Sequence, residues 1–528
     1  MHLPLAVPNI WYRASLTVAG RTVTGVTLPG ILGIIVGSNG DVAWGFTNSH
    51  IDTSDVVIVE PDPADPTRYR VPDGDGWEKF EVVRETISVA GRAPETIEIV
   101  STRWGPLLTK RDTGGRMLAL HWVAYDPKAI NLHLSDMMEA HSVDEAIAVA
   151  HGTGIPAQNF LVGDRFGHVA WTIIGRVPRR LGSDGLLPQS WADGSRRWDD
   201  FLSPSEVPVA RDPPNGQIWT ANNRVLGGEA LALLGGDYDD PTRAAQIRDR
   251  LTALTGRAVV PNDLLAVQLD DESLFLRRWR DLLLSTLTDE AVRDSPTLTE
   301  LRHIVKEWHG HAAIGEAGHR LVREFRRVVT EMVLNPIYEP VRQREPSLHI
   351  SRTKFPSSEQ PLWSILTARP AHLLPSSVSS WDALLLRAAN LTAEMAGREP
   401  GGLALRDCTW GRVNTLKMHH PLSGGLPSWL GRWLDMAAQA LPGDSNMPRV
   451  QTPDFGASMR MVVSPGREPE GIFHQPGGAS GNPLSPFYRA GHDDWAAGRA
   501  TPFLAGEKKH RLALHPLGKV SDANPLSD

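Results

Sequence analysis

The stretch Gly37-Ser-Asn-Gly-Asp-Val-Ala-Trp-Gly-Phe-Thr-Asn48 follows the apolar run Ile31-Leu-Gly-Ile-Ile-Val36, and together they predict a β-hairpin. Asn39-Gly40 readily adopts positive φ angles, so we expect a type I′ turn there. A second hairpin is predicted at Phe160-Leu-Val-Gly-Asp-Arg-Phe-Gly-His-Val-Ala-Trp171, which also turns at a glycine and ends in Val-Ala-Trp. The two hairpins indicate neighbouring strands of a large antiparallel sheet and are too few for a repeat architecture.

Four regions follow from the pattern along the chain. Residues 1–240 are mainly strands, interrupted by a short helix that the capping box Ser142-Val-Asp-Glu145 opens. Residues 241–335 are helical, residues 336–400 form a Pro- and Ser-rich ordered connector with a helix near its end, and residues 401–528 are a Gly- and Pro-rich β region. The apolar residues that recur at helical spacing in the second region are Ala244, Ile247, Leu251, Leu254, Leu298, Leu301, Ile304, Val305, Trp308, Leu321, Val322, Phe325, Val328, Val329 and Met332.

Composition narrows the class of protein. With 528 residues, 41% hydrophobic and 22% charged, the chain is ordinary for a globular protein of two to four packed units. A net charge of −7 does not indicate nucleic-acid binding. The arginines of residues 319–333 alternate with an apolar stripe, as expected for the solvated face of an amphipathic helix. No apolar run is long enough to span a bilayer. The single Cys408 excludes an intrachain disulfide.

Several common catalytic patterns are missing. His309-Gly-His311 and His419-His420 lack a partner at a metal-ligand spacing, and nothing basic surrounds Cys408 to activate it. The pair Gly477-Gly478 lacks the Lys-Ser/Thr of a phosphate-binding loop. No Gly-x-Ser-x-Gly elbow is present, which argues against an ordinary serine hydrolase.

A set of short blocks, in order along nearly the whole chain, resembles the penicillin acylase family of N-terminal nucleophile hydrolases. The blocks are Ile10-Trp-Tyr12, Gly25-Val-Thr-Leu-Pro-Gly30, Gly37 to Asn48, Gln158-Asn-Phe160, Thr220-Ala-Asn-Asn-Arg224, Gln268-Leu-Asp270 and Gln475-Pro-Gly-Gly-Ala-Ser-Gly-Asn482. The resemblance implies the α/β class, with a four-layer α/β/β/α core, a helical insertion and a β-rich C-terminal region that completes the core. It implies hydrolysis of a linear amide to a carboxylic acid and an amine. An N-acyl β-lactam, as in antibiotic metabolism, an N-acyl homoserine lactone and other acyl amines all remain open as the small-molecule substrate.

The resemblance also assigns candidate active-site residues. Asn222 matches the asparagine whose side-chain amide stabilises the tetrahedral oxyanion, and Asn48 matches the position whose main-chain N–H is the second donor. We expect these two donors to face one point, with the adjacent Asn223 structural. His2 matches a position near the nucleophile's amino group, and Arg243 matches an arginine that opens a helix and supports the asparagine.

A structural calcium ion is a further implication of the resemblance. Asp52-Thr-Ser-Asp55 matches the family's calcium loop, in which two carboxylates meet at a turn. The main-chain carbonyls of Ser54 and Pro178 match two further ligands. Another ligand comes from the family's small subunit, and one more aspartate is expected among Asp237, Asp239 and Asp240.

The nucleophile itself is expected outside this sequence. In the family it is the first residue of the mature catalytic chain, exposed when a precursor (a zymogen) cuts itself and leaves a separate small subunit that forms the acyl pocket. Met1-His-Leu-Pro-Leu5 resembles the middle of a family segment, which places the nucleophile roughly twenty residues before Met1. We therefore expect residues 1–528 alone to be inactive. No signal peptide is visible at Met1, although the resemblance implies a periplasmic or secreted protein.

Two alternatives are open. The chain could be a non-catalytic binding or scaffold protein that retains the fold. The 17 tryptophans could instead belong to a β-rich carbohydrate-binding protein, which requires Trp on one flat exposed face. The hydrolase interpretation predicts that Trp44, Trp171 and Trp410 are buried strand residues.

Overall fold

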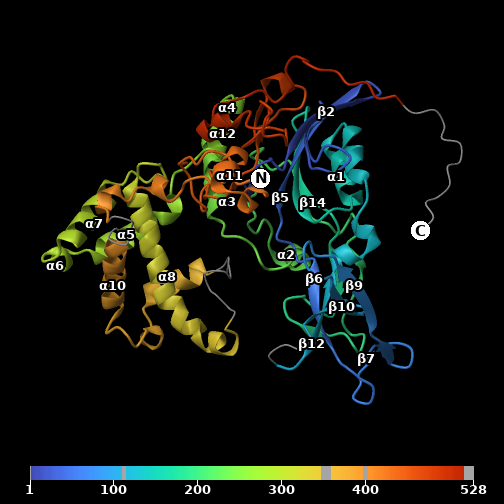
Figure 1. Cartoon of the computed structure of the whole chain (residues 1–528), viewed down its shortest axis with the longest axis horizontal. Helices are drawn as coiled ribbons and strands as arrows, with labels where there is room; N and C mark the ends of the chain where they lie inside the picture. Colours follow the sequence, from blue (N-terminus) through green and yellow to red (C-terminus); the bar gives the residue numbers. More distant parts are fainter. Residues whose placement is uncertain (1, 110–113, 347–357, 396–401, 516–528) are drawn as a thin grey trace.

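A seven-stranded antiparallel sheet forms the centre of the computed structural model, which describes residues 2–109, 114–346, 358–395 and 402–515 (Figure 1). In spatial order its strands are β18 (Val209–Arg211), β14 (Val169–Ile174), β13 (Gln158–Asp164), β5 (Val42–Asn48), β4 (Val36–Ser38), β3 (Arg21–Thr27) and β2 (Tyr12–Val18). The second predicted hairpin is confirmed as β13–β14. The first is present as β4–β5, but its first strand is Val36–Ser38, and residues 31–35 of the predicted strand are loop. Strand β5 pairs with β13, with Asn48 opposite Gln158, so the hairpins are neighbours as expected.

The turn of the first hairpin differs from the predicted type I′. Gly40 has a φ of +94°, but Asn39 has no positive φ, so the glycine stands at the first central position as in a type II′ turn. The side chain of Asn39 has another use. Its Oδ1 accepts the N–H groups of Asp41 and Val42 at 2.9 and 2.8 Å, and its Nδ2 donates to three carbonyls within residues 137–140. Asn39 thus ties the turn to a distant segment, which the local pattern could not reveal.

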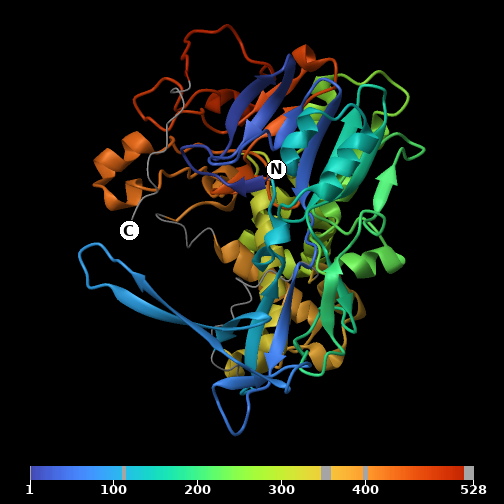
Figure 2. The same ribbon diagram turned by 90° about the vertical axis from the view of Figure 1, so that its right-hand side faces the viewer.

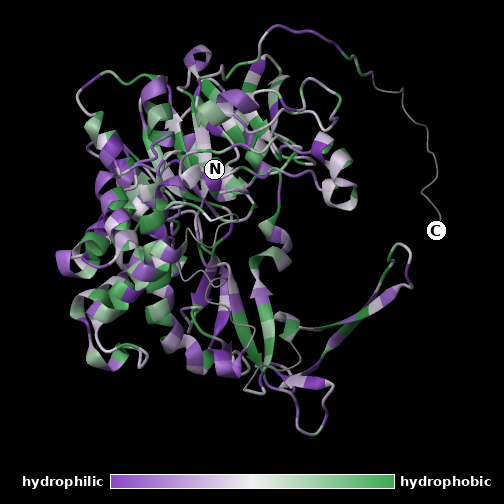
Figure 3. Cartoon of the chain, turned by 60° about the vertical axis from the view of Figure 1, so that its left-hand side comes forward, coloured by the Kyte–Doolittle hydropathy of each residue, from purple (hydrophilic) through white to green (hydrophobic). Residues whose placement is uncertain are grey.

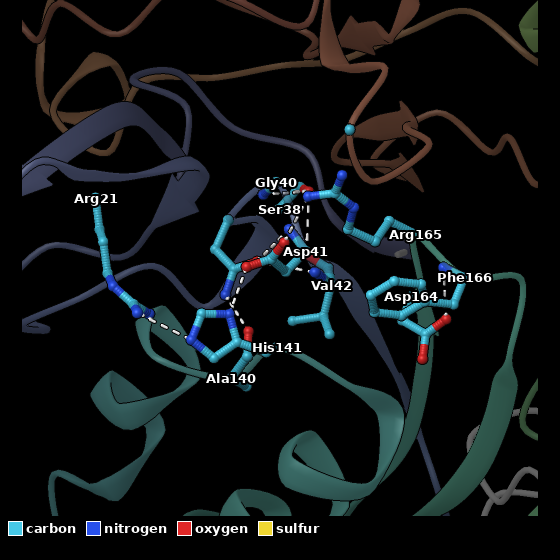
Figure 4. Close-up of polar contacts among 12 residues, drawn as sticks. Arg21, Ser38, Gly40, Asp41, Val42, Ala140, His141, Asp164, Arg165 and Phe166 are labelled. Carbon is cyan, nitrogen blue, oxygen red and sulfur yellow. Dashed lines mark hydrogen bonds and ion pairs between the residues drawn. The ribbon is translucent and has the colours of Figure 1, made fainter.

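A charged cluster beside this turn connects the tips of the two hairpins (Figure 4). The carboxylate of Asp41 accepts from His141 at 2.6 Å and from Arg165 at 3.2 Å, and Arg21 contacts the other nitrogen of the His141 ring at 2.9 Å. Burial raises the pKa of Asp41, but the hydrogen bonds from His141 and Arg165 outweigh it and hold that pKa below its usual value.

The central sheet is one of four stacked layers. Helix α1 (Val143–Gly152) begins after Ser142, whose Oγ accepts the Glu145 N–H at 3.3 Å, and covers one face of the sheet. The other face packs on two short antiparallel pairs, which in turn contact helix α4. Those elements are β1 (His2–Pro4) with β19 (Phe455–Ala457), β20 (Arg460–Val462) with β21 (Ile472–His474), and α4 (Pro261–Gln268). This order of helix, sheet, strands and helix is the expected α/β/β/α arrangement, with its second sheet divided into two-stranded pairs.

A second sheet of six strands lies at one end of the first (Figure 1). In spatial order it contains β16 (Gln189–Ser190), β6 (Ser54–Val59), β12 (Met117–Trp122), β11 (Gly105–Thr109), β10 (Glu95–Thr102) and β9 (Glu81–Ile87). Strands β9 and β10 extend away from the body as a two-stranded ribbon (Figures 2 and 3). One face of the ribbon pairs Arg84 with Glu98. The other presents exposed apolar side chains, namely Val83, Ile87, Ile97 and Ile99.

The helical region is larger than predicted. The expected apolar stripes are confirmed on α7 (Pro296–Glu307) and α8 (Ala317–Arg344), which pack with α5 (Arg277–Thr286), α9 (Glu359–Ala368) and α10 (Trp381–Ala393) around one core. The predicted connector was wrong in part, because α8 continues through Pro336 and Pro340 and α9 lies beyond it. Packing of Val333 and Leu334 in the core outweighs the local cost of these prolines. Residues 347–357 and 396–401 of the predicted connector and C-terminal regions lie outside the described residues.

The C-terminal region contains less strand than predicted. Within residues 402–515, β19, β20 and β21 have three residues each, and helices α11 (Ser428–Leu434) and α12 (His492–Ala497) lie among loops. The glycines and prolines that indicated turns break the strands. Trp44 and Trp171 are buried strand residues, as the hydrolase interpretation predicted. Trp410 is buried too, but it begins a short 3-10 helix (Trp410–Arg412) and not a strand. Trp429 and Trp433 on α11 are exposed. Among the described helices, none is long and apolar enough to cross a membrane.

A buried ion cluster joins α8 to the C-terminal region. The Asp444 carboxylate contacts Arg323 Nε at 2.8 Å and His319 Nε2 at 3.2 Å, and the His319 ring lies edge-on to Trp410. Burial raises the pKa of Asp444, but Arg323 and His319 together lower it to about 2.

We expect Asp444→Asn to destabilise the protein by about 2 kcal/mol at neutral pH. The folded-state pKa lies below the unfolded value, so this contribution is fully present above about pH 4 and is lost as the pH falls toward 2. Urea unfolding of wild type and Asp444→Asn measures the difference in their unfolding free energies. This difference should be the same at pH 7 and pH 5 and smaller at pH 3. Asp382→Asn, at a carboxylate that is 82% exposed, is the control. Equal stabilities at pH 7 would contradict the prediction.

Candidate active site

Asn222 lies in a loop that brings it to the end of the central sheet. Its side-chain Nδ2 donates to the main-chain carbonyl of Asn48, at the end of β5, at 2.8 Å. The two residues are 174 positions apart, so the fold brings together the pair that the sequence analysis singled out. The contact differs from the expected one, because the amide reaches the Asn48 carbonyl rather than sharing a point with its N–H. Asn222 has a φ of +68°, a left-handed conformation that asparagine tolerates better than most residues.

Arg243 fixes the orientation of the Asn222 amide. It lies in the first turn of α3 (Thr242–Ala253), and its Nη2 donates to Asn222 Oδ1 at 2.8 Å and to Asp239 Oδ2 at 2.7 Å. A guanidinium only donates and a carbonyl only accepts, so the amide oxygen faces Arg243 and the nitrogen faces Asn48. The amide nitrogen carries two hydrogens, and the bond to Asn48 uses one of them.

Asn223 has a local role, as expected for one of the two adjacent asparagines. Its Oδ1 accepts the Ala221 N–H at 3.0 Å and its Nδ2 donates to the Arg224 carbonyl at 2.8 Å. Both bonds stabilise the loop that carries Asn222. The structure therefore separates the two asparagines by partner: Asn223 bonds only its own loop, and Asn222 reaches across to the sheet.

His2 lies beside this cluster. It is half-buried in β1, opposite Ala457 of β19, and burial together with the nearby charges of Arg243 and Arg460 holds the pKa of its imidazole well below the usual range. Burial and these charges therefore favour the uncharged form of the imidazole. Burial also lowers the pKa of Arg460 to about 9.

Asn159 is a member of the cluster to which the sequence analysis gave no role. Its Nδ2 donates to the Asn48 carbonyl at 3.2 Å and to Thr47 Oγ1 at 2.9 Å, while its Oδ1 accepts from the Trp171 indole at 2.9 Å. Asn159 thus holds the end of β5 through the same Asn48 carbonyl that accepts from Asn222. Asn159 belongs to the block Gln158-Asn-Phe160, which is part of the resemblance, so this block could have indicated a role for Asn159.

The hydroxyl next to Asn48 is engaged in the fold. Ser49 is buried, and its Oγ donates to the Ala157 carbonyl at 2.9 Å. This serine also lacks a neighbouring base in the hydrogen bonds described for it. The cluster therefore provides an amide donor, an imidazole and a guanidinium around the end of β5, but Ser49 is not poised as its nucleophile.

The residues expected to bind calcium do not fit that ion. Asp52 and Asp55 converge, but both meet the guanidinium of Arg180, in β15 (Pro178–Leu181), at 3.1 and 3.0 Å. Ser54 lies beside Asp55 in β6, and Pro178 begins β15. The other candidates are engaged elsewhere or exposed: Asp239 pairs with Arg243, Asp240 accepts the Thr242 N–H at 2.9 Å, and Asp237 is exposed. The described residues contain no group of three or more His, Cys, Asp or Glu that could hold a metal ion.

The fold is that of a solved penicillin acylase. The structure of a thermostable penicillin G acylase from Alcaligenes faecalis matches this chain with a TM-score of 0.69 and 17% identity, covering 98% of this chain and 97% of that one. The four layers and this match define the fold of the N-terminal nucleophile hydrolases.

Sequence comparison identifies the family. The family model for penicillin amidase matches residues 1–511, and the chain belongs to that family. It is 27% identical to a penicillin acylase 2 proenzyme of Pseudomonas sp. strain SE83 and 25% identical to the acyl-homoserine lactone acylase QuiP of Pseudomonas aeruginosa. Each alignment covers 95% of this chain and 64% of the relative, so the chain spans about two thirds of their length.

Proposed function

We propose that this protein is an amidohydrolase that cleaves a linear acyl amide into a carboxylic acid and an amine. The observation that carries the proposal is the Asn222 amide, oriented by Arg243 and placed at the end of β5. Its second N–H is a neutral donor for the oxyanion that develops when the amide carbonyl is attacked. Membership of the penicillin amidase family supports the same reaction.

In this proposal the nucleophile is an N-terminal residue that residues 1–528 do not supply. Such a nucleophile uses its own α-amino group as the base. His2 is proposed as the neighbour of that amino group, because an uncharged imidazole can accept a hydrogen bond from it. The main-chain N–H of Asn48 is the proposed second donor. Asn159 and Arg243 are positioning residues, since each acts on the catalytic pair through a hydrogen bond.

The substrate is proposed at the level of the acyl amide. The relatives are named as a penicillin acylase and as an acyl-homoserine lactone acylase, and both names describe removal of an acyl group from an amine. The acyl pocket of the family combines both products of the precursor. We therefore propose a second, smaller chain from the same precursor as the partner that completes the pocket.

The test expresses the complete reading frame that contains residues 1–528 and, separately, residues 1–528 alone. Each purified protein is incubated with penicillin G, an N-acyl homoserine lactone and an N-acyl aniline, and the released amine is measured. We expect release from at least one substrate by the first protein and none by the second. A folded first protein that binds these compounds without cleaving any would favour the binding-protein alternative. Turnover by residues 1–528 that disappears in a serine variant would refute the external nucleophile.

A further inference from the structure

The loop expected to bind calcium contains its own cation. Arg180 Nη2 lies 3.1 Å from Asp52 Oδ2, and its Nε lies 3.0 Å from Asp55 Oδ2 and 3.3 Å from Oδ1. Nη2 also donates to the main-chain carbonyl of Asp52 at 3.1 Å. The Arg180 side chain is 9% exposed and that of Asp55 is 5% exposed, so this is a buried, multiply bonded ion cluster.

Neighbouring side chains enclose the guanidinium. It lies over the Trp198 ring at 5.7 Å from the centroid, and the Trp198 indole N–H donates to Asp55 Oδ2. Asp55 therefore has its oxygens engaged by a guanidinium and an indole together. A planar guanidinium can both stack on a ring and bond carboxylates through a fork of N–H groups, which suits it to this place.

The main chain closes over the same cluster. Gly185 has a φ of +77°, and a Cβ there would lie 2.6 Å from both Arg180 Nε and Asp55 Oδ1. Gly235 is comparably close to Asp52, since a Cβ would lie 2.9 Å from the Asp52 Cβ. Two glycines thus allow two loops to pack directly on the ion cluster. This leaves the carboxylates facing the arginine and not an open coordination shell.

Calcium and Arg180 would compete for the same oxygens. A calcium ion takes 6–8 oxygen ligands at 2.3–2.6 Å, mostly carboxylate and carbonyl oxygens. Here the Asp55 carboxylate and the Asp52 carbonyl already accept from one guanidinium, and the Asp52 carboxylate forms an ion pair with it. A divalent ion in the loop would have to displace that group, and it would then stand beside an unpaired buried positive charge.

We propose that Arg180 replaces the expected calcium ion, so that this protein is folded and stable without calcium. The arginine joins β15 to the start of β6. Arg180 also holds the end of the loop that runs from Asn48 to Asp52. At that end the Asp52 N–H donates to the Leu234 carbonyl at 3.0 Å. Its role is structural and does not depend on which reaction the protein catalyses.

The test measures calcium binding and thermal unfolding of the full-length protein. By equilibrium dialysis against calcium, wild type should bind no stoichiometric ion. Its Tm should be the same with excess EGTA and with millimolar calcium. One calcium per chain, lost in Asp55→Asn, would overturn the proposal, as would a Tm that falls in EGTA.

A matched pair of variants tests the arginine itself. Arg180→Ala should lower the Tm by about 5 °C or more, because two carboxylates lose their shared partner. Millimolar calcium should recover part of that loss, since the emptied space resembles a calcium loop. Arg179→Ala, which removes the neighbouring, more exposed arginine of the same strand, should change the Tm far less. An Arg180→Ala protein as stable as wild type would contradict the proposal, and should it fail to fold, the wild-type dialysis still decides.

Discussion

Replacing Asn222 with alanine should lower the turnover number of the full-length protein by roughly 100- to 1,000-fold, the usual cost of losing one oxyanion donor. The reason is specific to the site. Arg243 Nη2 and the Asn48 carbonyl fix the amide from opposite ends, so the remaining N–H points in one direction without reorganisation. The change should appear in kcat more than in KM, because the bond strengthens as negative charge develops.

A second variant separates the amide from the backbone. Asn222 has a φ of +68°, so alanine adds conformational strain there while glycine does not. If the amide is what matters, Asn222→Gly should lose as much activity as Asn222→Ala while keeping a Tm nearer to wild type. Asn223→Ala, which removes only bonds within the loop, should lose far less activity. Wild-type turnover in both Asn222 variants would end the oxyanion assignment.

The largest loss of stability is expected in the helical core. Trp279 is 0% exposed, packs edge-on against Trp363 and Phe325, and donates from its indole to Glu359 at 2.8 Å. Trp279→Ala should therefore destabilise the protein by about 3–5 kcal/mol, because it leaves a large cavity. It also removes one donor from a buried carboxylate. Urea unfolding followed by circular dichroism at 222 nm measures the effect.

Two comparisons isolate the contributions. Trp279→Phe keeps most of the buried ring but removes the N–H, so it should cost less, about 1–2 kcal/mol. Trp433→Ala removes a tryptophan that is 67% exposed on α11 and should leave the unfolding midpoint nearly unchanged. The packing account fails if the alanine variants at 279 and 433 unfold at the same urea concentration.

The features that the sequence predicted well have local signals. Alternating apolar residues and a glycine turn located both hairpins, and a period near 3.6 residues located α7 and α8. The pairing of Asn222 with Asn48 came instead from the resemblance, because 174 residues separate them and no local pattern joins them. The prolines at 336 and 340 were misleading, since their effect on a helix depends on core packing that a local window does not contain.

The features that were missed depend on long-range partners. Asn39 was expected to serve through its own backbone angle, but its side chain bonds residues almost 100 positions away. Arg180 pairs with Asp52 and Asp55, which lie more than 120 positions earlier in the chain. A single sequence does not show which charged residues pair across such a distance. The calcium expectation came from the match of residues 52–55 to the family's calcium loop, together with the carbonyls of Ser54 and Pro178. Knowledge of the opposing strand was needed to see that a guanidinium already lies between the two aspartates.

The β9–β10 ribbon can open locally, with a free energy of opening that is separate from the free energy of global unfolding. Strand β9 pairs with β10, and β10 joins the sheet at its base, where Ser101 and Thr102 pair with β11, so the outer part of the ribbon can open without disturbing either sheet core. Proteolysis at its tip, near Gly91, would then report only this local opening and not the global unfolding that Trp279 controls. The ribbon also leaves β9 with a free edge and an apolar face, where self-association would begin. Glu85 and Glu95 interrupt that face, and their charges oppose the stacking of one ribbon on another.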